Sequence, residues 1–179
     1  MALTITNTEV FKDGDARVMK FDGATSVLTL GSTLVLGTEF TFIGWFALGD
    51  TGAFMAVAGF QAPASDSYPL LFSYGATTIY THDGTSATSV IDADLFDGNW
   101  HQVGVVRNGT NVKFYLDGAQ TGVDKTLGTN NALSINRIGN RNGAFNYAGK
   151  MSDVRAYSGL LTAAEISQMF TNERAKYNV

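Results

Sequence analysis

Residues 97–122 have the sequence DGNWHQVGVVRNGTNVKFYLDGAQTG, and this stretch decides the fold class. Two apolar runs flank Asn108-Gly109, and a second turn pair, Asp117-Gly118, follows. Asn-Gly and Asp-Gly tolerate the positive φ angles of a two-residue type I′ turn, whose twist matches that of paired strands. The stretch therefore predicts a meander of two hairpins, with strands near residues 100–107, 111–116 and 119–124.

The faces of these strands indicate their depth in a sheet. In the middle strand Val112, Phe114 and Leu116 point one way and alternate with residues that point the other way. We expect one face of this strand to pack on a core and the other to meet solvent. The first strand, residues 100–107, is apolar on both faces, which predicts a position deeper in the sheet.

The composition limits the class of protein. A chain of 179 residues is long enough for one domain that buries roughly 70% of its unfolded surface. It has no cysteine, so neither disulfides nor thiolate metal sites are expected. Charged residues are 16% of the chain and the basic ones are scattered, which argues against a nucleic-acid partner. No apolar run reaches the ~20 residues of a membrane span, so no membrane insertion is expected.

The rest of the chain has the pattern of an all-β protein. Residues 38–48, TEFTFIGWFAL, are apolar on both faces and predict a central strand. Further strands are expected near residues 51–60 and 88–95, among others. Strand and turn signals that recur every eight to twelve residues or so are typical of an antiparallel sandwich or jelly roll.

One segment near the C-terminus predicts a helix. Thr162 and Glu165 have the spacing of a capping box. The apolar residues that follow at helical spacing are Ile166, Met169, Phe170 and Tyr177. A single short helix on an all-β chain is expected to cover an edge or end of a sheet.

Five pieces of the chain together resemble a known family. In order they are VMKFDGATSVLTL, FTFIGWFAL, DGNWHQVGVVRNGTNVKFYLDG, INRIGN and GKMSDVRAYSGLLTAAEISQMF. They resemble laminin-G-like modules of the concanavalin A-like jelly-roll superfamily, from about residue 17 to about residue 170. The resemblance implies an antiparallel β-sandwich of jelly-roll type with a short C-terminal α-helix. We assign residues 16–179 to this domain and residues 1–15 to an N-terminal arm or extra strand.

The acidic residues do not predict catalysis. A glycoside hydrolase needs two carboxylates that flank the scissile bond. The one close pair, Asp92 and Asp94, precedes a turn and is expected to be solvated. His101 follows the core Trp100 and is expected to make a local hydrogen bond. With no nucleophile motif and no glycine-rich phosphate loop, the protein is predicted not to be an enzyme.

The resemblance raises the question of calcium. In relatives the opening FDG turn and an acidic residue of the closing strand can share a calcium ion. Asp22 matches the first position and Asp153 the second of two acidic positions, whereas Ser152 occupies the first. Neighbouring strand residues face opposite sides, so Asp153 is a poor replacement. The expectation is therefore no cofactor, with Ca²⁺ at Asp22 and Asp153 as the alternative.

Two places carry aromatic and hydrogen-bonding residues of the kind that bind sugars. Tyr80 and His82 share one face of a predicted strand, with Tyr74 across a turn. A loop at residues 140–147, NRNGAFNY, supplies the other candidates, which are Asn140, Arg141, Asn142, Phe145 and Tyr147. The alternative is that the loop is an ordered connection, in which asparagines satisfy backbone groups and the two aromatic rings fold inward.

These observations favour a non-catalytic recognition or structural module at an outer surface. The chain begins without a signal peptide and lacks cysteine, which favours a bacteriophage virion surface protein, on capsid or tail, that binds glycans. Its partners would be a glycan or protein surface and capsid or tail proteins, with a homotrimer as one oligomeric state. The alternative is a carbohydrate-binding or adhesion module of a larger secreted, extracellular protein. A glycoside hydrolase ranks third.

Overall fold

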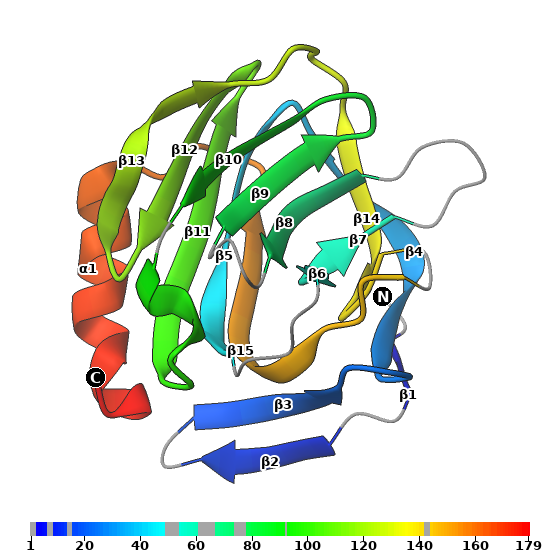
Figure 1. Ribbon diagram of the computed structural model, residues 1–179, viewed down its shortest axis with the longest axis vertical. Helices are drawn as coiled ribbons and strands as arrows, with labels where there is room; N and C mark the ends of the chain where they lie inside the picture. Colours follow the sequence, from blue (N-terminus) through cyan, green and yellow to red (C-terminus); the bar gives the residue numbers. More distant parts are fainter. Residues whose placement is uncertain are drawn as a thin grey trace.

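The computed structural model describes residues 3–6, 9–13, 16–48, 54–60, 67–73, 78–91, 93–141 and 144–179 (Figure 1). Within these residues the fold is an antiparallel β-sandwich with a C-terminal helix, which confirms the predicted fold class. No helix in this part of the chain is both long and apolar enough to cross a membrane.

One layer of the sandwich is a sheet of seven antiparallel strands. Their order is β13 (Ala119–Thr126), β12 (Asn111–Leu116), β11 (Trp100–Asn108), β5 (Glu39–Ala47), β15 (Ala148–Tyr157), β3 (Ala16–Asp22) and β2 (Glu9–Asp13). The two strands predicted to be apolar on both faces, β5 and β11, lie next to each other inside this sheet, as expected.

The other layer consists of two four-stranded sheets. One has the order β1 (Leu3–Thr6), β4 (Val27–Gly37), β14 (Leu133–Ile138) and β7 (Ala58–Gly59). The other has the order β10 (Ala87–Ile91), β9 (Thr78–Asp83), β8 (Ser67–Ser73) and β6 (Phe54–Ala56). The single strand expected near residues 51–60 is thus split at Val57, because β6 pairs with β8 while β7 pairs with β14. The chain therefore passes at Val57 directly from the sheet that contains β6 into the sheet that contains β7.

The main core fills the space between the two layers. Phe42 and Phe46 of β5 and Val105 of β11 contribute from the seven-stranded sheet, and Leu28 and Ile79 from the other layer. All five side chains are at most 2% exposed. The alternating apolar positions of the strands therefore meet across the sandwich, as their period of two requires.

The meander has the predicted strands, but its two turns differ. Asn108 pairs with Asn111, so the first two-residue loop is Gly109-Thr110, one residue later than predicted. Only Gly109 has positive φ there, which fits a type II′ turn rather than type I′. The second loop is Asp117-Gly118 with positive φ at both positions, as a type I′ turn requires.

A buried ion pair ties the two layers together at one end. Arg107 of β11 is fully buried, and its guanidinium lies 3.5 Å from the carboxylate of Asp83 at the end of β9. Arg107 Nε also donates to the carbonyl oxygen of Gly109 at 2.8 Å. Asp83 in turn accepts hydrogen bonds from the backbone N–H groups of Ser86 and Asn131. A buried charge is tolerated here because it is paired and hydrogen-bonded.

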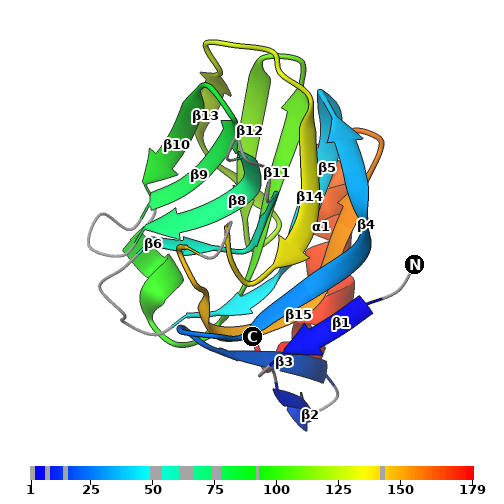
Figure 2. The same ribbon diagram turned by 90° about the vertical axis from the view of Figure 1, so that its right-hand side faces the viewer.

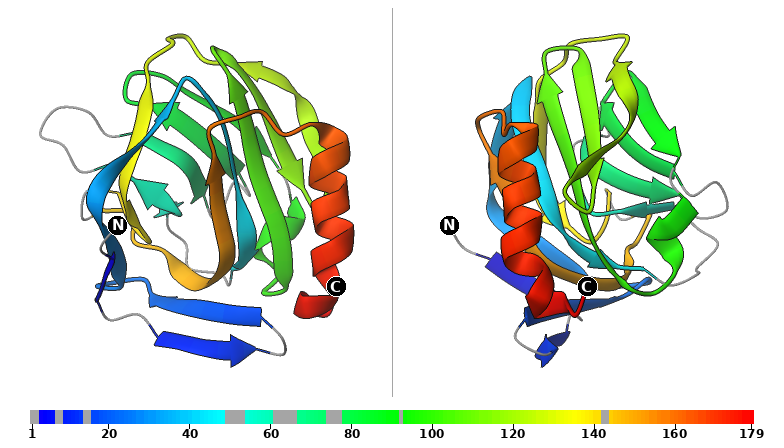
Figure 3. Two further views of the ribbon diagram at one scale, coloured as in Figure 1. Left: turned by 180° about the vertical axis from the view of Figure 1, so that it is seen from behind. Right: turned by 90° about the vertical axis from the view of Figure 1, so that its left-hand side faces the viewer.

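The C-terminal helix covers the outer face of the seven-stranded sheet rather than an edge (Figure 3). α1 (Ala163–Glu173) begins after Thr162, and the predicted capping box with Glu165 is present. The short 3-10 helix η2 (Arg174–Tyr177) continues it and carries Tyr177. This face needs a cover because β5 and β11 are apolar on both sides. Tyr115 is buried in the same cluster, so the outer face of β12 does not simply meet solvent as expected.

The N-terminal residues form strands. β1 pairs with β4 in one layer, while β2 pairs with β3 at the edge of the other (Figure 2). Residues 1–15 were expected to form either an arm or an extra strand, and the residues described among them, 3–6 and 9–13, form strands. Another difference lies at residues 88–95, where β10 ends at Ile91 and the 3-10 helix η1 (Ala93–Phe96) follows.

Candidate functional site

Aromatic side chains gather on the outer face of the sheet that contains β6, β8 and β9. Figure 1 shows where these strands lie in the sandwich. On β9 the core residue Ile79 alternates with Tyr80, and Thr81 alternates with His82. Because successive side chains of a strand point to opposite faces, Tyr80 and His82 share the outer face, as predicted. Tyr74, their expected neighbour, lies outside the described residues.

Rings from the neighbouring strands complete this surface. The ring of Tyr68 stacks on His82 at 5.0 Å, since the two residues are paired across β8 and β9. The ring of Phe54 on β6 lies 6.2 Å from that of Tyr80, and 46% of Phe54 is exposed. The face thus presents a row of rings that the protein does not cover completely.

The loop at residues 140–147 brings two further side chains to the same place. Phe145 lies with its ring 5.5 Å from that of Phe54, and its carbonyl oxygen accepts a hydrogen bond from the N–H of Ala56 at 2.8 Å. The guanidinium of Arg141 lies 4.2 Å from the centre of the Phe145 ring and 5.6 Å from that of Tyr68. We call the set Phe54, Tyr68, Tyr80, His82, Arg141 and Phe145 the aromatic patch.

Phe145 adopts an unusual backbone conformation. Its φ is 54°, a left-handed value that costs a residue with a Cβ roughly 1–2 kcal/mol. The surrounding hydrogen bonds hold it there, since Arg141 and Ala144 exchange two backbone bonds at 2.8 and 2.7 Å and the N–H of Tyr147 donates to Gly139. Strain of this kind is often found where a side chain is positioned for binding. Here it places an aromatic ring beside Phe54 and Arg141.

Polar groups accompany the rings. The N–H of Gly84 donates to Nδ1 of His82 at 2.9 Å, which leaves Nε2 as the donor of the neutral ring. Tyr80 adds a phenolic hydroxyl, which both donates and accepts. The six residues of the aromatic patch include no carboxylate and therefore not the carboxylate pair that most glycoside hydrolases use. The patch can stack on an apolar surface and hydrogen-bond at its rim.

Two other predicted loop residues, Tyr147 and Asn140, do not reach this surface. Tyr147 is fully buried in the main core, where its ring meets Phe21 edge-on at 5.6 Å and its hydroxyl donates to the carbonyl oxygen of Lys150. Burial raises the pKa of the Tyr147 hydroxyl well above its usual value. Asn140 is 5% exposed and lies against Gly59. Asn142 lies outside the described residues.

Two members of the patch, Phe54 and Tyr68, were not predicted from the sequence. Each stands at an outward position of a strand, and Met55 and Val57 beside Phe54 belong to the core. A large ring that alternates with core residues is the signal that could have indicated Phe54. For Tyr68 the signal is weaker, because the pairing of β8 with β9 contains a bulge and its register cannot be read locally.

The two carboxylates of the calcium alternative do not lie together. Asp22 pairs with Ala148, whereas Asp153 lies five residues further along β15, which is about 16 Å at about 3.3 Å per residue. Asp22 accepts four hydrogen bonds from its own turn, and these bonds hold its pKa far below the usual value. Asp153 faces Lys176 and Arg155 at 3.6 and 3.4 Å. These two residues do not fit a shared calcium ion.

Within the described residues, no group of three or more His, Cys, Asp or Glu side chains is placed to hold a metal ion. His101 makes the local hydrogen bonds that were expected, with Nδ1 2.8 Å from Asp117 and Nε2 3.1 Å from Asp97. The hydrogen bond to Asp117 raises the pKa of His101, although burial acts in the opposite direction. This cluster lies at the beginning of β11, where His101 is hydrogen-bonded to Asp117 of the second turn of the meander.

Comparisons with known proteins give the fold a family. No curated protein sequence matches this chain. Among solved structures, the binding domain of botulinum neurotoxin serotype D superposes with a TM-score of 0.69 at 12% identity, over 96% of this chain and 47% of that one. The chain thus spans about half the length of that domain.

Two other structures are similar over different shares of their length. A heptameric SAP-like pentraxin from Limulus polyphemus has a TM-score of 0.67 and 16% identity, over 89% of this chain and 84% of that one. A Trypanosoma rangeli sialidase, solved in complex with sialic acid, has a TM-score of 0.66 and 14% identity, over 99% of this chain and 30% of that one.

These identities are low, so the superpositions show a shared fold. The sequence itself decides the family, because the family described as the concanavalin A-like lectin/glucanases superfamily matches residues 22–167. The chain belongs to the concanavalin A-like lectin/glucanases superfamily, as its five sequence pieces predicted.

Proposed function

We propose that this protein is a non-catalytic carbohydrate-binding module and that the aromatic patch is its glycan site. One observation carries the proposal: two sequence segments that were separate candidates, residues 80–82 and 140–147, meet on one outer face with Phe54 and Tyr68. The superfamily supports it, because its name includes lectins, whereas the fold alone does not specify a function.

The chemistry of the patch suits a sugar. Rings exposed at their faces or edges can stack on the C–H face of a pyranose, and burial of such rings contributes the larger part of the binding energy. Arg141, His82 and Tyr80 can hydrogen-bond hydroxyl groups at the rim. The rings are already held by one another and by the strand pairing, so little side-chain entropy is lost on binding.

A glycan array tests the proposal. We expect the protein to bind at least one oligosaccharide, and the variant Phe54→Ala to bind it about tenfold more weakly, since a lost aromatic contact of up to about 1.5 kcal/mol corresponds to that factor. Val10→Ala is the matched control, because Val10 is an exposed apolar residue of β2 on the other layer.

Two outcomes would contradict the proposal. If no glycan is bound by the array or by titration, the lectin function fails. If a glycan is bound equally well by Phe54→Ala, the site lies elsewhere. Running the array with calcium and with a chelator tests the calcium alternative at the same time, and equal binding is expected because Asp22 and Asp153 lie apart.

For the biological setting we propose the surface of a virion, on capsid or tail. The cysteine-free composition supports it, since assembly in a reducing cytoplasm leaves no role for disulfides. Mass spectrometry of purified particles should find the chain at stoichiometric copy number, in threes if the trimer is correct. A gene that also encodes a secretion signal and further domains would instead favour the adhesion module.

A further inference from the structure

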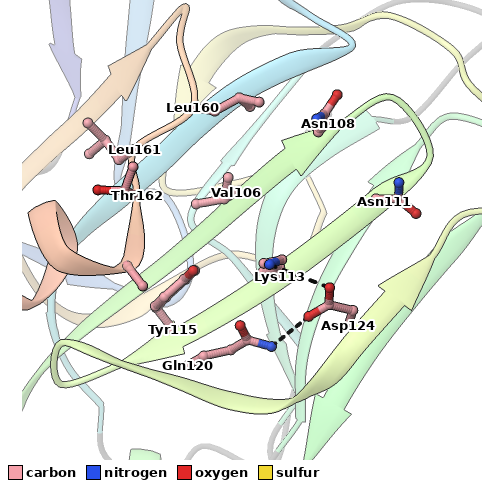
Figure 4. A pocket seen from close by; sticks show the side chains of 11 residues that line it. Val106, Asn108, Asn111, Lys113, Tyr115, Gln120, Asp124, Leu160, Leu161 and Thr162 are labelled. Carbon is pink, nitrogen blue, oxygen red and sulfur yellow. Dashed lines mark hydrogen bonds and ion pairs between the residues drawn. The ribbon is translucent and has the colours of Figure 1, made fainter.

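A hollow lies on the layer opposite the aromatic patch, between the outer face of the seven-stranded sheet and the segment that leads into α1 (Figure 4). Its volume is about 450 Å³, within the range of ~300–1,000 Å³ of small-molecule sites. Its lining comes from β11, β12, β13 and residues 160–163. None of these residues belongs to the aromatic patch.

The hollow has one apolar side. Leu160 and Leu161 stand opposite the strands, and Val106 of β11 lies between them and the polar residues (Figure 4). Val106 and Leu161 belong to the cluster packed under α1, whereas Leu160 is 39% exposed. The apolar side is therefore fixed by the same packing that holds the helix.

The other side is polar and balanced in charge. Lys113 of β12 and Asp124 of β13 form an ion pair at 3.5 Å, and Gln120 donates to the same carboxylate at 2.8 Å. Figure 4 shows this row together with Asn108 and Asn111, whose amides both donate and accept. The ion pair is about half exposed and contributes little to stability, so a ligand hydroxyl can replace part of it.

We propose that this hollow is a second binding site, for a single neutral polyhydroxylated ring such as one monosaccharide unit. A pyranose has one face of C–H groups, which fits Leu160 and Leu161, and a rim of hydroxyls, which fits Lys113, Asp124 and the amides. A volume of about 450 Å³ is enough for one such ring with part of its hydration.

Charged ligands fit less well. An anion at Lys113 would also meet the carboxylate of Asp124. The beginning of α1 does not compensate, because the carboxylate of Glu165 already accepts hydrogen bonds from the N–H and hydroxyl of Thr162, both at 2.8 Å. A cation at Asp124 would meet Lys113. The paired charges therefore select a neutral ligand.

Protein-observed NMR with neutral monosaccharides tests the proposal. The probes are glucose, galactose, mannose and N-acetylglucosamine, with acetate and methylammonium as charged comparisons. We expect one of the sugars to shift the backbone signals of Lys113, Tyr115 and Asp124 with a dissociation constant of about 1–10 mM, the range that so small a ligand allows. Acetate and methylammonium should not shift them at the same concentration.

Matched variants separate this site from the glycan site of the aromatic patch. Asp124→Ala should weaken binding at the hollow about tenfold and leave the signals of the aromatic patch responsive, because Asp124 is exposed and its loss does not disturb the core. Phe54→Ala should weaken binding at the aromatic patch and leave the signals of the hollow responsive. Leu160→Ala, on the apolar side, should weaken binding at the hollow about threefold.

The second site is overturned if none of the sugars shifts the signals of Lys113 and Asp124. It is also overturned if acetate or methylammonium shifts them more than any sugar, or if Asp124→Ala leaves the titration unchanged. Glycan binding that is lost in Phe54→Ala, with no response at Lys113 and Asp124 to any sugar, supports the aromatic patch and contradicts the hollow. Sugar shifts at Lys113 and Asp124 that are lost in Asp124→Ala and kept in Phe54→Ala support the hollow independently of the patch.

Discussion

The two outer faces of the sandwich carry similar aromatic side chains, but they differ in what packs against those side chains and in how far the rings are exposed. On the seven-stranded sheet, Trp45 is 1% exposed because α1 and η2 lie over it. On the sheet of β6, β8 and β9, none of the described helices packs against the rings, and Phe54 remains 46% exposed. One face is therefore part of the stabilising core, whereas the other leaves the ring of Phe54 open to solvent and buries its neighbour Tyr68 to 8% exposure.

The contacts show how the first face is closed. The ring of Trp45 stacks against Phe170 at 5.6 Å and against Tyr177 at 4.1 Å, both at an interplanar angle of 18°. Its Nε1 donates to Glu173 at 2.9 Å, and Glu173 also accepts from Arg155 at 2.6 Å. On the aromatic patch, by contrast, the contacts of the described residues run between the rings themselves and Arg141.

Replacing Trp45 by Ala should have the largest effect. It removes a fully buried ring, both stacking contacts and a hydrogen bond, and we expect a loss of about 3–5 kcal/mol in the free energy of unfolding. Denaturant unfolding measures it. Phe54→Ala, on the open face, is the control and should cost less than about 1 kcal/mol. Equal losses in the two variants would contradict the distinction between the faces.

Glu173→Ala should have the next largest effect. The change leaves the indole N–H of Trp45 and the guanidinium of Arg155 without this partner, at a cost of about 1–3 kcal/mol. Glu173→Gln keeps a hydrogen-bond acceptor but not the charge, so it should lose less. A thermal melt of both variants checks the order, and a Glu173→Ala variant that melts no lower than Glu173→Gln would contradict it.

Phe145→Gly probes the open face. Glycine adopts the φ of 54° without strain, which returns roughly 1 kcal/mol, while the lost ring contacts cost a similar amount. The free energy of unfolding should therefore change by less than about 1 kcal/mol, while glycan binding falls about tenfold. A variant that unfolds easily, or that keeps full binding, would show that the strained ring supports the fold rather than the site.

The smallest effect concerns pH. The folded protein raises the pKa of His101 through Asp117 and Asp97, so the protonated ring stabilises the fold. Its contribution is complete below the unfolded pKa of about 6.5 and is lost as pH rises through the higher folded pKa. Stability measured from pH 6 to 9 should decline over this window, and the decline should be shallower in His101→Gln. Identical slopes would exclude His101 as the cause.

The sequence predicted most of the strands and the helix because their signals are local. Alternation in β12, two-sided apolarity in β5 and β11, and the capping box at Thr162 each depend on neighbours within a few residues. Predictions that depended on exact register were less accurate. The first turn of the meander is displaced by one residue to Gly109-Thr110, since Asn108 continues the strand pairing.

The candidate site could be predicted only in fragments. Tyr80 and His82 share a face by the period of a strand, and Arg141 and Phe145 stand in a loop rich in suitable groups. Nothing local indicates that the loop folds back onto β6, or that Tyr147 of the same loop turns into the core. Long-range hydrogen bonds, such as that from Ala56 to Phe145, decide both.

By itself, then, the sequence determined the all-β class, the family and the paired strands of the meander, because periodicity and turn residues act over short distances. Only the tertiary structure decided that α1 covers Trp45 on one outer face while Phe54 stays open on the other. It also decided that two distant segments form one aromatic patch. The physical reason is that a strand's own pattern specifies which side chains share a face, whereas the packing of the whole chain specifies what covers that face.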